Sequence, residues 1–145
     1  MSLVGNKAPA FKLPAVVNNE LGEIDSEKLL GKWTVLFFYP LDFTFVCPTE
    51  ILAFSDAAPT FAELGANVLG VSVDSQFTHL AWVNTPKDQG GLGKLNIPLV
   101  ADLNKQLASD YGVLVQDAGV ALRGVFIIDP QGVVQSAIIN NLGVG

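Results

Sequence analysis

The chain has 145 residues, of which half are hydrophobic and 15% are charged, and its formal net charge is −6. This length suits one core, so we expect residues 1–145 to form one domain. The acidic balance argues against nucleic acid as a partner, and no apolar run approaches the roughly 18 residues of a membrane span. No signal peptide is predicted, and a single cysteine excludes an internal disulfide. These features favour a reducing, cytoplasmic setting.

The first forty residues predict a hairpin, a short helix and a strand. Residues 5–24 hold an Asn-Asn pair and a glycine between apolar stretches, which is typical of a hairpin. Residues 25–31 begin with capping residues and end at a glycine, so they favour a short helix at best. Residues 33–40, WTVLFFYP, are a continuous apolar run that ends at Pro40. Such a run indicates a strand buried on both faces.

The central part of the chain predicts alternating helices and strands. Residues 49–65 have helical periodicity, with a kink expected at Pro59 and a stop at the final glycine. Residues 67–74 predict a second buried strand. Residues 75–84 predict an amphipathic helix, and an irregular segment follows it.

The last part predicts a third strand over residues 98–102, a short helix over 104–112 and a β-hairpin over 120–140. Parallel units followed by an antiparallel pair make an α/β fold with a mixed sheet. Nothing follows the final strand to cover its face of the sheet. We therefore expect that a last helix and a tail are absent and that the domain is incomplete at its C-terminal end.

Cys47, the only cysteine, lies between the predicted strand 33–40 and the helix that follows. A lone intracellular cysteine is usually a small buried filler. Pro48 suits the first position of a helix, which would place Cys47 where backbone N–H groups and the helix dipole favour an anion. That position lowers the pKa of a thiol, and binding crevices of open α/β sheets lie at the carboxyl ends of strands. Both readings, filler and nucleophile, stay open at this point.

Arg123 is the only arginine, and it is predicted to lie in the middle of an apolar strand, VALRGVFIID. A lone arginine is usually a solvated surface group. A guanidinium buried among apolar neighbours instead needs an anionic partner. The thiolate of Cys47, assisted by Glu50, is the candidate partner, and the arginine offers several fixed donors for a substrate's oxygens.

Other chemistries find less support in the sequence. His79 would make a Cys–His dyad with Cys47, as in a cysteine hydrolase, but a histidine at a helix surface or core edge is the favoured interpretation. One histidine and one cysteine cannot form a zinc cluster. The segment 90–94, GGLGK, lacks the first glycine and the Ser or Thr of a phosphate loop, and no dinucleotide fingerprint is present.

Pro40, Thr44 and Cys47 spell P-x-x-x-T-x-x-C within FFYPLDFTFVCPTE. Together with SVDSQFTHLAWVNTP, GGLG and LRGVFIID, this motif resembles the typical two-cysteine peroxiredoxins, thiol peroxidases like the peroxidase component of alkyl hydroperoxide reductase. The resemblance spans essentially the whole chain. It implies a thioredoxin-like fold and the reduction of hydrogen peroxide and organic hydroperoxides without a cofactor.

The resemblance also implies a role for each matching residue. Cys47 would be the peroxidatic cysteine, whose thiolate attacks a peroxide oxygen and becomes a sulfenic acid. Thr44 would donate a hydroxyl hydrogen bond to the thiolate or the incoming oxygen. Arg123 would hold the thiolate and stabilise charge on the breaking O–O bond. Pro40 would shield the nucleophile from water, and Glu50 would orient Arg123.

The C-terminus departs from the two-cysteine pattern. In that pattern the polypeptide continues into a helix and a tail with a second, resolving cysteine, which forms a disulfide with Cys47 of the partner subunit. A thioredoxin-type partner then reduces this disulfide. Here the chain ends at Gly145 and has no second cysteine, so either the sequence is truncated or an external thiol serves as reductant.

Assembly follows from the resemblance and from the apolar last strand. Family members pair this strand edge to edge, which predicts a homodimer through residues 132–140. Five dimers then form a ring through segments around Phe43 and Thr78, so a decamer is expected. A non-catalytic thioredoxin-fold module, acting as a holdase or redox sensor, is the second hypothesis for the function.

Overall fold

The computed structural model describes residues 3–40, 42, 47–89, 91–93 and 95–140, with the side chains of residues 47–50 outside the description. In chain order the elements are β1 Lys12–Val17, β2 Glu20–Asp25, the 3₁₀ turn η1 Ser26–Leu29, β3 Trp33–Phe38, α1 Cys47–Glu63, β4 Ala66–Ser72, α2 Gln76–Asn84, the 3₁₀ turn η2 Lys87–Gln89, β5 Leu99–Ala101, α3 Gln106–Asp110, β6 Leu114–Val115, β7 Val120–Ala121, β8 Arg123–Ile128 and β9 Val134–Asn140. Among these described residues, no helix is long and apolar enough to cross a membrane.

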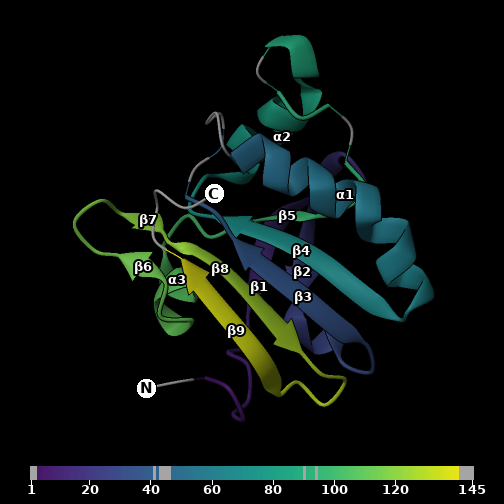
Figure 1. Ribbon diagram of the computed structural model, residues 1–145. Coiled ribbons are helices and arrows are strands. Elements are labelled where there is room, and N and C mark those ends of the chain that lie inside the picture. The colour runs from purple at the N-terminus through teal and green to yellow at the C-terminus, as the bar shows by residue number, and fades with distance from the viewer. Residues whose placement is uncertain (1–2, 41, 43–46, 90, 94, 141–145) are drawn as a thin grey trace.

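Seven strands form one twisted mixed sheet in the order β2-β1-β5-β4-β3-β8-β9 (Figure 1). The central strands β3, β4 and β5 are parallel, and β8 and β9 extend the sheet antiparallel beside β3. The expected α/β mixed sheet is therefore confirmed. β6 and β7 form a separate small hairpin at the edge of the molecule.

The sheet divides the core into two layers, because successive side chains of a strand point to opposite faces. Leu36 and Phe38 of β3 pack with Phe126 of β8 and with the segment around α3. Val35 and Phe37 of β3 face the other way, toward α1 and α2. Every residue of β3 after Trp33 is buried, as the continuous apolar run predicted.

Most of the helices and strands were predicted correctly from local sequence patterns. The N-terminal hairpin turns at Asn18 and Asn19, which both adopt the left-handed backbone conformation that asparagine tolerates. Ser75 caps α2 by accepting a hydrogen bond from the backbone N–H of Thr78 at 3.1 Å. β8 and β9 form the C-terminal part of the hairpin predicted over residues 120–140, with their turn at residues 129–132.

One expectation about the strands was wrong. The segment from Val120 to Ile128 is two strands, β7 and β8, with Leu122 between them, and the N–H of Leu122 donates to the carbonyl of Val113 at 2.7 Å. Arg123 is consequently the first residue of β8 and does not lie in the middle of a strand. The N-terminal hairpin also joins the main sheet, through two antiparallel pairs between β1 and β5.

Gly70 shows how tightly the centre of the sheet is packed. It pairs with Phe37 of β3 on one side and with Leu99 of β5 on the other. A Cβ at Gly70 would lie 2.8 Å from the Phe37 ring and 3.0 Å from the Leu99 side chain. The missing side chain gives the Phe37 ring its space, and that ring stacks on Phe54 of α1 at 4.5 Å.

We expect Gly70→Ala to destabilise the protein by about 1–3 kcal/mol, because overpacking forces the Phe37 ring from its place. Chemical denaturation measures this change. The matched control is Gly22→Ala in β2, where the new Cβ would meet Val17 at an ordinary 3.4 Å. An equal effect of the two substitutions would contradict the packing explanation.

Candidate active site

The pairing of β3 with β8 fixes the position of Arg123. Phe38, the last residue of β3, pairs with Gly124, so Arg123 lies at the carboxyl end of β3. Arg123 is buried, with 8% of its surface exposed. Of the two interpretations of this arginine, solvated or buried, the structure therefore shows the buried one.

The backbone of α1 begins at Cys47, close in sequence to the end of β3. In Figure 1, α1 starts near the arrowhead of β3 and runs back along the sheet. Because β8 begins at this end of the sheet too, the topology brings Arg123 and the start of α1 close to the carboxyl end of β3. The N-terminus of a helix carries partial positive charge, which stabilises a thiolate.

The remaining predicted site residues lie partly outside the described structure. Thr44 lies outside the described residues, and so do the side chains of Cys47 and Glu50. Pro40 directly follows the buried Tyr39 and is itself half-buried. The described residues therefore establish the positions of Pro40, of Arg123 and of the backbone at Cys47 and Glu50.

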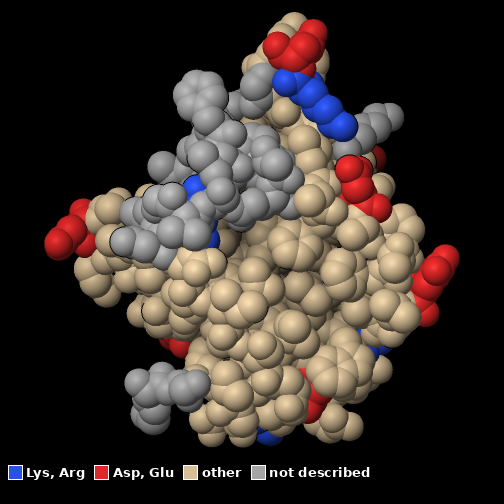
Figure 2. Space-filling model, viewed as in Figure 1, with Lys and Arg blue, Asp and Glu red and all other residues tan. Residues whose placement is uncertain are grey.

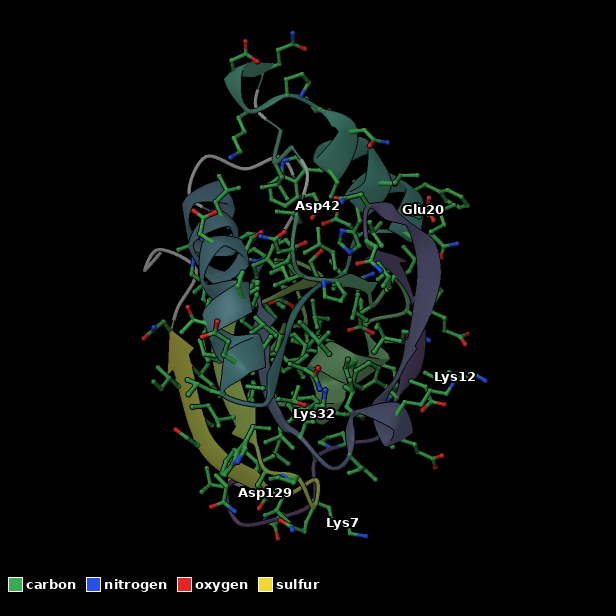
Figure 3. All side chains as sticks on the ribbon, turned by 90° about the vertical axis from the view of Figure 1, so that its right-hand side faces the viewer. Lys7, Lys12, Glu20, Lys32, Asp42 and Asp129 are labelled. Atoms are coloured by element: carbon green, nitrogen blue, oxygen red, sulfur yellow. The ribbon has the colours of Figure 1, made fainter. Side chains whose placement is uncertain are left out.

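A buried polar network holds the chain where it leaves β3. The Tyr39 hydroxyl donates to Oδ1 of Asp42 at 2.6 Å, and Oδ2 of Asp42 lies 2.6 Å from Nδ1 of His79. Tyr39 and His79 are fully buried, and Asp42 is 7% exposed. Figure 3 shows Asp42 at the end of the sheet opposite Lys7 and Asp129.

The hydrogen bonds define where the protons of this network lie. Nε2 of His79 is 3.0 Å from the carbonyl of Val100, so it must donate there. The short contact between Nδ1 and Asp42 then also needs one proton, which the histidine and the carboxyl group share. Burial raises the pKa of Asp42, and the hydrogen bond from His79 opposes part of that shift. Burial, reinforced by Asp42, also raises the pKa of Tyr39.

The carboxylate of Asp74 holds the backbone of Asp42. Oδ2 of Asp74 accepts hydrogen bonds from the backbone N–H of Asp42 at 2.7 Å and from the Ser72 hydroxyl at 2.8 Å. Asp42, Asp74 and His79 offer ligand atoms within 4.8 Å of one another and could hold a metal ion. The hydrogen bonds given above already engage all three of these side chains.

The expected position of His79 was wrong. A helix-surface or core-edge histidine was predicted, whereas the ring is fully buried and bonded at both nitrogens. The sequence carried no signal for this, because Asp42 and Val100 lie 37 and 21 positions away. Both ring nitrogens of His79 are therefore occupied in a structural network.

Comparisons with known proteins agree with this arrangement. The AhpC/TSA family model matches residues 4–137. Peroxiredoxin-2 of Bos taurus is 61% identical over 98% of this chain and 71% of its own length. The mitochondrial thioredoxin-dependent peroxide reductase of Rattus norvegicus is 58% identical over 98% of this chain and 55% of its own length.

Solved structures give the same answer for the fold. The reduced 2-Cys peroxiredoxin of Plasmodium vivax has a TM-score of 0.96 and 45% identity, covering all of this chain and 76% of its own. AhpC of Enterococcus faecalis has a TM-score of 0.93 and 39% identity, covering all of this chain and 85% of its own. Fold and site thus define a thioredoxin-like thiol peroxidase, and the resemblance seen in the sequence is confirmed. The chain belongs to the AhpC/TSA family and is a peroxiredoxin, a thiol-dependent peroxidase of antioxidant defence.

The raised pKa of Asp42 makes stability depend on pH. Because the folded state binds this proton more tightly than the unfolded state, the stabilisation is full below the ordinary pKa of 3.8 and is lost as pH rises through the raised value. Asp42→Asn stays neutral at every pH, so its free energy of unfolding should not fall as pH rises. The fall expected for the wild type is about 1.4 kcal/mol for each pKa unit of the shift.

Urea denaturation between pH 4 and 7 measures the effect. The exposed Asp56→Asn serves as control and should leave the wild-type pH profile unchanged. If the free energy of unfolding changed with pH in the same way in wild type and Asp42→Asn, the buried carboxyl group would not be the source of the pH dependence.

Proposed function

We propose that Cys47 is the peroxidatic nucleophile and that the protein reduces hydrogen peroxide and organic hydroperoxides. One observation carries this proposal: the chain's only cysteine begins α1 at the end of the sheet where the buried Arg123 begins β8. A helix N-terminus and a guanidinium both lower the pKa of a thiol and raise its thiolate fraction. Both features favour nucleophilic attack at neutral pH.

The proposed reaction is a two-electron oxidation of sulfur. The thiolate of Cys47 attacks the terminal peroxide oxygen, and the S–O bond forms as the O–O bond breaks. Sulfur becomes a sulfenic acid, and the leaving hydroxide or alkoxide takes a proton and departs as water or alcohol. One external thiol then condenses with the sulfenic acid and releases water. A second thiol attacks the external sulfur of the mixed disulfide, which frees the Cys47 thiolate and releases the two external thiols as a disulfide.

The other site residues act around this step. Arg123 stabilises the thiolate and the negative charge that develops on the breaking O–O bond. Thr44 donates its hydroxyl to the thiolate or the attacked oxygen, and Glu50 orients the guanidinium. Pro40 limits the access of water to the nucleophile. None of these roles needs a cofactor.

The reductant we propose is a thioredoxin-type protein or another thiol. A relative at 58% identity is named a thioredoxin-dependent peroxide reductase. We place the reaction in the cytoplasm, where thiols are kept reduced, and propose that residues 1–145 act as a single domain.

Cys47→Ser should abolish the sulfenic acid that dimedone traps after hydrogen peroxide is added, because no other thiol exists in the chain. Arg123→Ala should keep the trapped adduct but lower its rate of formation on the order of 100-fold, since one preorganised charge is lost. Mass spectrometry of the adduct against time gives both results.

The exposed Lys12→Ala is the control for loss of a positive charge, and it should react at the wild-type rate. Wild-type kinetics in Arg123→Ala would contradict the role of the guanidinium. An adduct in Cys47→Ser would contradict the site itself.

We further propose a homodimer that pairs through β9, and a decamer of such dimers. β9 is one edge of the sheet and has no charged residue, whereas β2 at the other edge carries Glu20 and Glu23. Charged side chains protect an edge strand from pairing, and an uncharged edge lacks that protection. Uncharged residues also cover the centre of the face that carries β8 and β9 (Figure 2). Thr78 in α2 and Phe43, which lies outside the described residues, are the proposed contacts between dimers.

Replacing Ile138 and Ile139 together by Lys should shift the protein toward monomer, because like charges would meet across the paired strands. Sedimentation equilibrium should give at least twice the 15.4 kDa chain mass for the wild type. Leu64→Lys is the control, since Leu64 is more exposed than either isoleucine and lies after α1. Identical masses for the β9 variant and the wild type would contradict pairing through this edge.

A further inference from the structure

Pro59 interrupts the backbone hydrogen bonds of α1. Proline has no backbone N–H, so residue 59 cannot donate to the carbonyl of Ser55, four residues earlier in the helix. Ser55 is buried, with 3% of its surface exposed. Because an unpaired backbone group is costly in the interior, the Ser55 carbonyl needs a donor from outside this helical bond.

Asn96 supplies that donor. Nδ2 of Asn96 donates to the carbonyl of Ser55 at 3.1 Å. The backbone N–H of Asn96 also donates to the Ser55 hydroxyl oxygen at 2.9 Å. The two bonds join the same two residues, which lie 41 positions apart in the chain. Together they fix the position and the rotation of α1 relative to the segment that holds Asn96.

The segment around Asn96 is itself tied to the sheet. The backbone N–H of Leu95 donates to Oδ1 of Asn19, in the turn between β1 and β2, at 2.9 Å. Leu95 and Ile97 are buried in the apolar layer that α1 covers, and β5 begins at Leu99. Asn96 therefore connects α1 to a part of the molecule that is held from both sides.

Apolar contacts also hold α1 on the sheet, where it lies beside β4 (Figure 1). Phe54 stacks on Phe37 at 4.5 Å, and Ile51 is fully buried. Apolar contacts have no preferred direction, so a helix held by them alone can slide and tilt. Hydrogen bonds require a defined distance and angle. The bonds of Asn96 therefore select one position of α1 among those that the apolar contacts permit.

A movement of α1 at Ser55 reaches Cys47. Ser55 follows Cys47 by eight residues, which is about 12 Å along a helix axis. A tilt of about 5° around Ser55 displaces the start of such a helix by about 1 Å. Arg123 belongs to β8 and stays with the sheet. Because a misplacement of about 1 Å can cost on the order of 100-fold in rate, the anchoring of α1 matters for the reaction.

We propose that Asn96 is a positioning residue for the peroxidase reaction. Its amide occupies the carbonyl that Pro59 leaves free, and it thereby holds α1, with Cys47 at its start, in place relative to Arg123. This inference rests on the proposed role of Cys47. Asn96 bonds to the middle of α1, so it acts through the helix and not on the peroxide.

Asn96→Ala removes the amide donor and keeps the backbone N–H. The formation of dimedone-trapped sulfenic acid after addition of hydrogen peroxide should slow on the order of tenfold. The pH midpoint for alkylation of Cys47 by iodoacetamide should rise toward that of a free thiol, because the thiolate is less well placed beside the guanidinium. A variant that is only less stable but still folded would keep the wild-type midpoint. Asn84→Ala, an exposed asparagine at the end of α2, is the control and should match the wild type.

A double-mutant cycle tests the part played by Pro59. In Pro59→Ala, residue 59 gains an N–H that can donate to the Ser55 carbonyl. Asn96→Ala should lower the midpoint of urea unfolding in the wild-type background, because it leaves that carbonyl without its donor. In the Pro59→Ala background the same substitution should lower the midpoint by less than half as much.

An unchanged alkylation midpoint in Asn96→Ala would overturn the proposal. Equal changes in Asn96→Ala and Asn84→Ala, or equal losses of the urea midpoint in the two backgrounds, would overturn it as well. Alkylation needs no peroxide and reports on the only thiol of the chain. A wild type that formed no sulfenic acid would contradict the proposed function, while the alkylation midpoints would still decide whether Asn96 positions Cys47.

Discussion

The antiparallel pairing of β3 with β8 is the constraint on which the active site depends. Five consecutive pairs, from Thr34 with Ile128 to Phe38 with Gly124, lock the two strands in one register. That register puts Arg123 beside the carboxyl end of β3, where the chain turns toward α1 and Cys47. A slip of one residue would turn Arg123 to the other face of the sheet. The fold thus fixes the cation before any contact within the site forms.

A second constraint acts on the link between β3 and α1. Tyr39, Asp42 and His79 bond to one another in the interior, and Asp74 accepts the backbone N–H of Asp42. These contacts hold the chain five residues before Cys47. Because the network is buried and each of its ring nitrogens and carboxyl groups has a partner, it adds rigidity as well as stability. Preorganisation of this kind is what electrostatic catalysis requires.

Much of this arrangement could be predicted from local sequence, and the rest depended on distant contacts. The apolar run ending at Pro40 predicted β3, and the amphipathic pattern of residues 75–84 predicted α2. The sequence left the burial of Arg123 open, whereas the start of α1 near Cys47 also followed from local pattern. The place of His79 did not, because its partners lie 21 to 37 positions away in the chain. The break before Arg123 was not predicted either; Leu122, which lies between β7 and β8, bonds to Val113 outside the segment.

The measurement that tests the central claim most directly is the rate at which Cys47 reacts with hydrogen peroxide near pH 7. Rapid mixing with tryptophan fluorescence follows it, and the buried Trp82, 5.9 Å from the Tyr39 ring, is a natural reporter. A free low-molecular-weight thiol provides the reference. An activated thiolate predicts a rate orders of magnitude above that reference. A rate equal to the reference would contradict the claim that α1 and Arg123 activate Cys47.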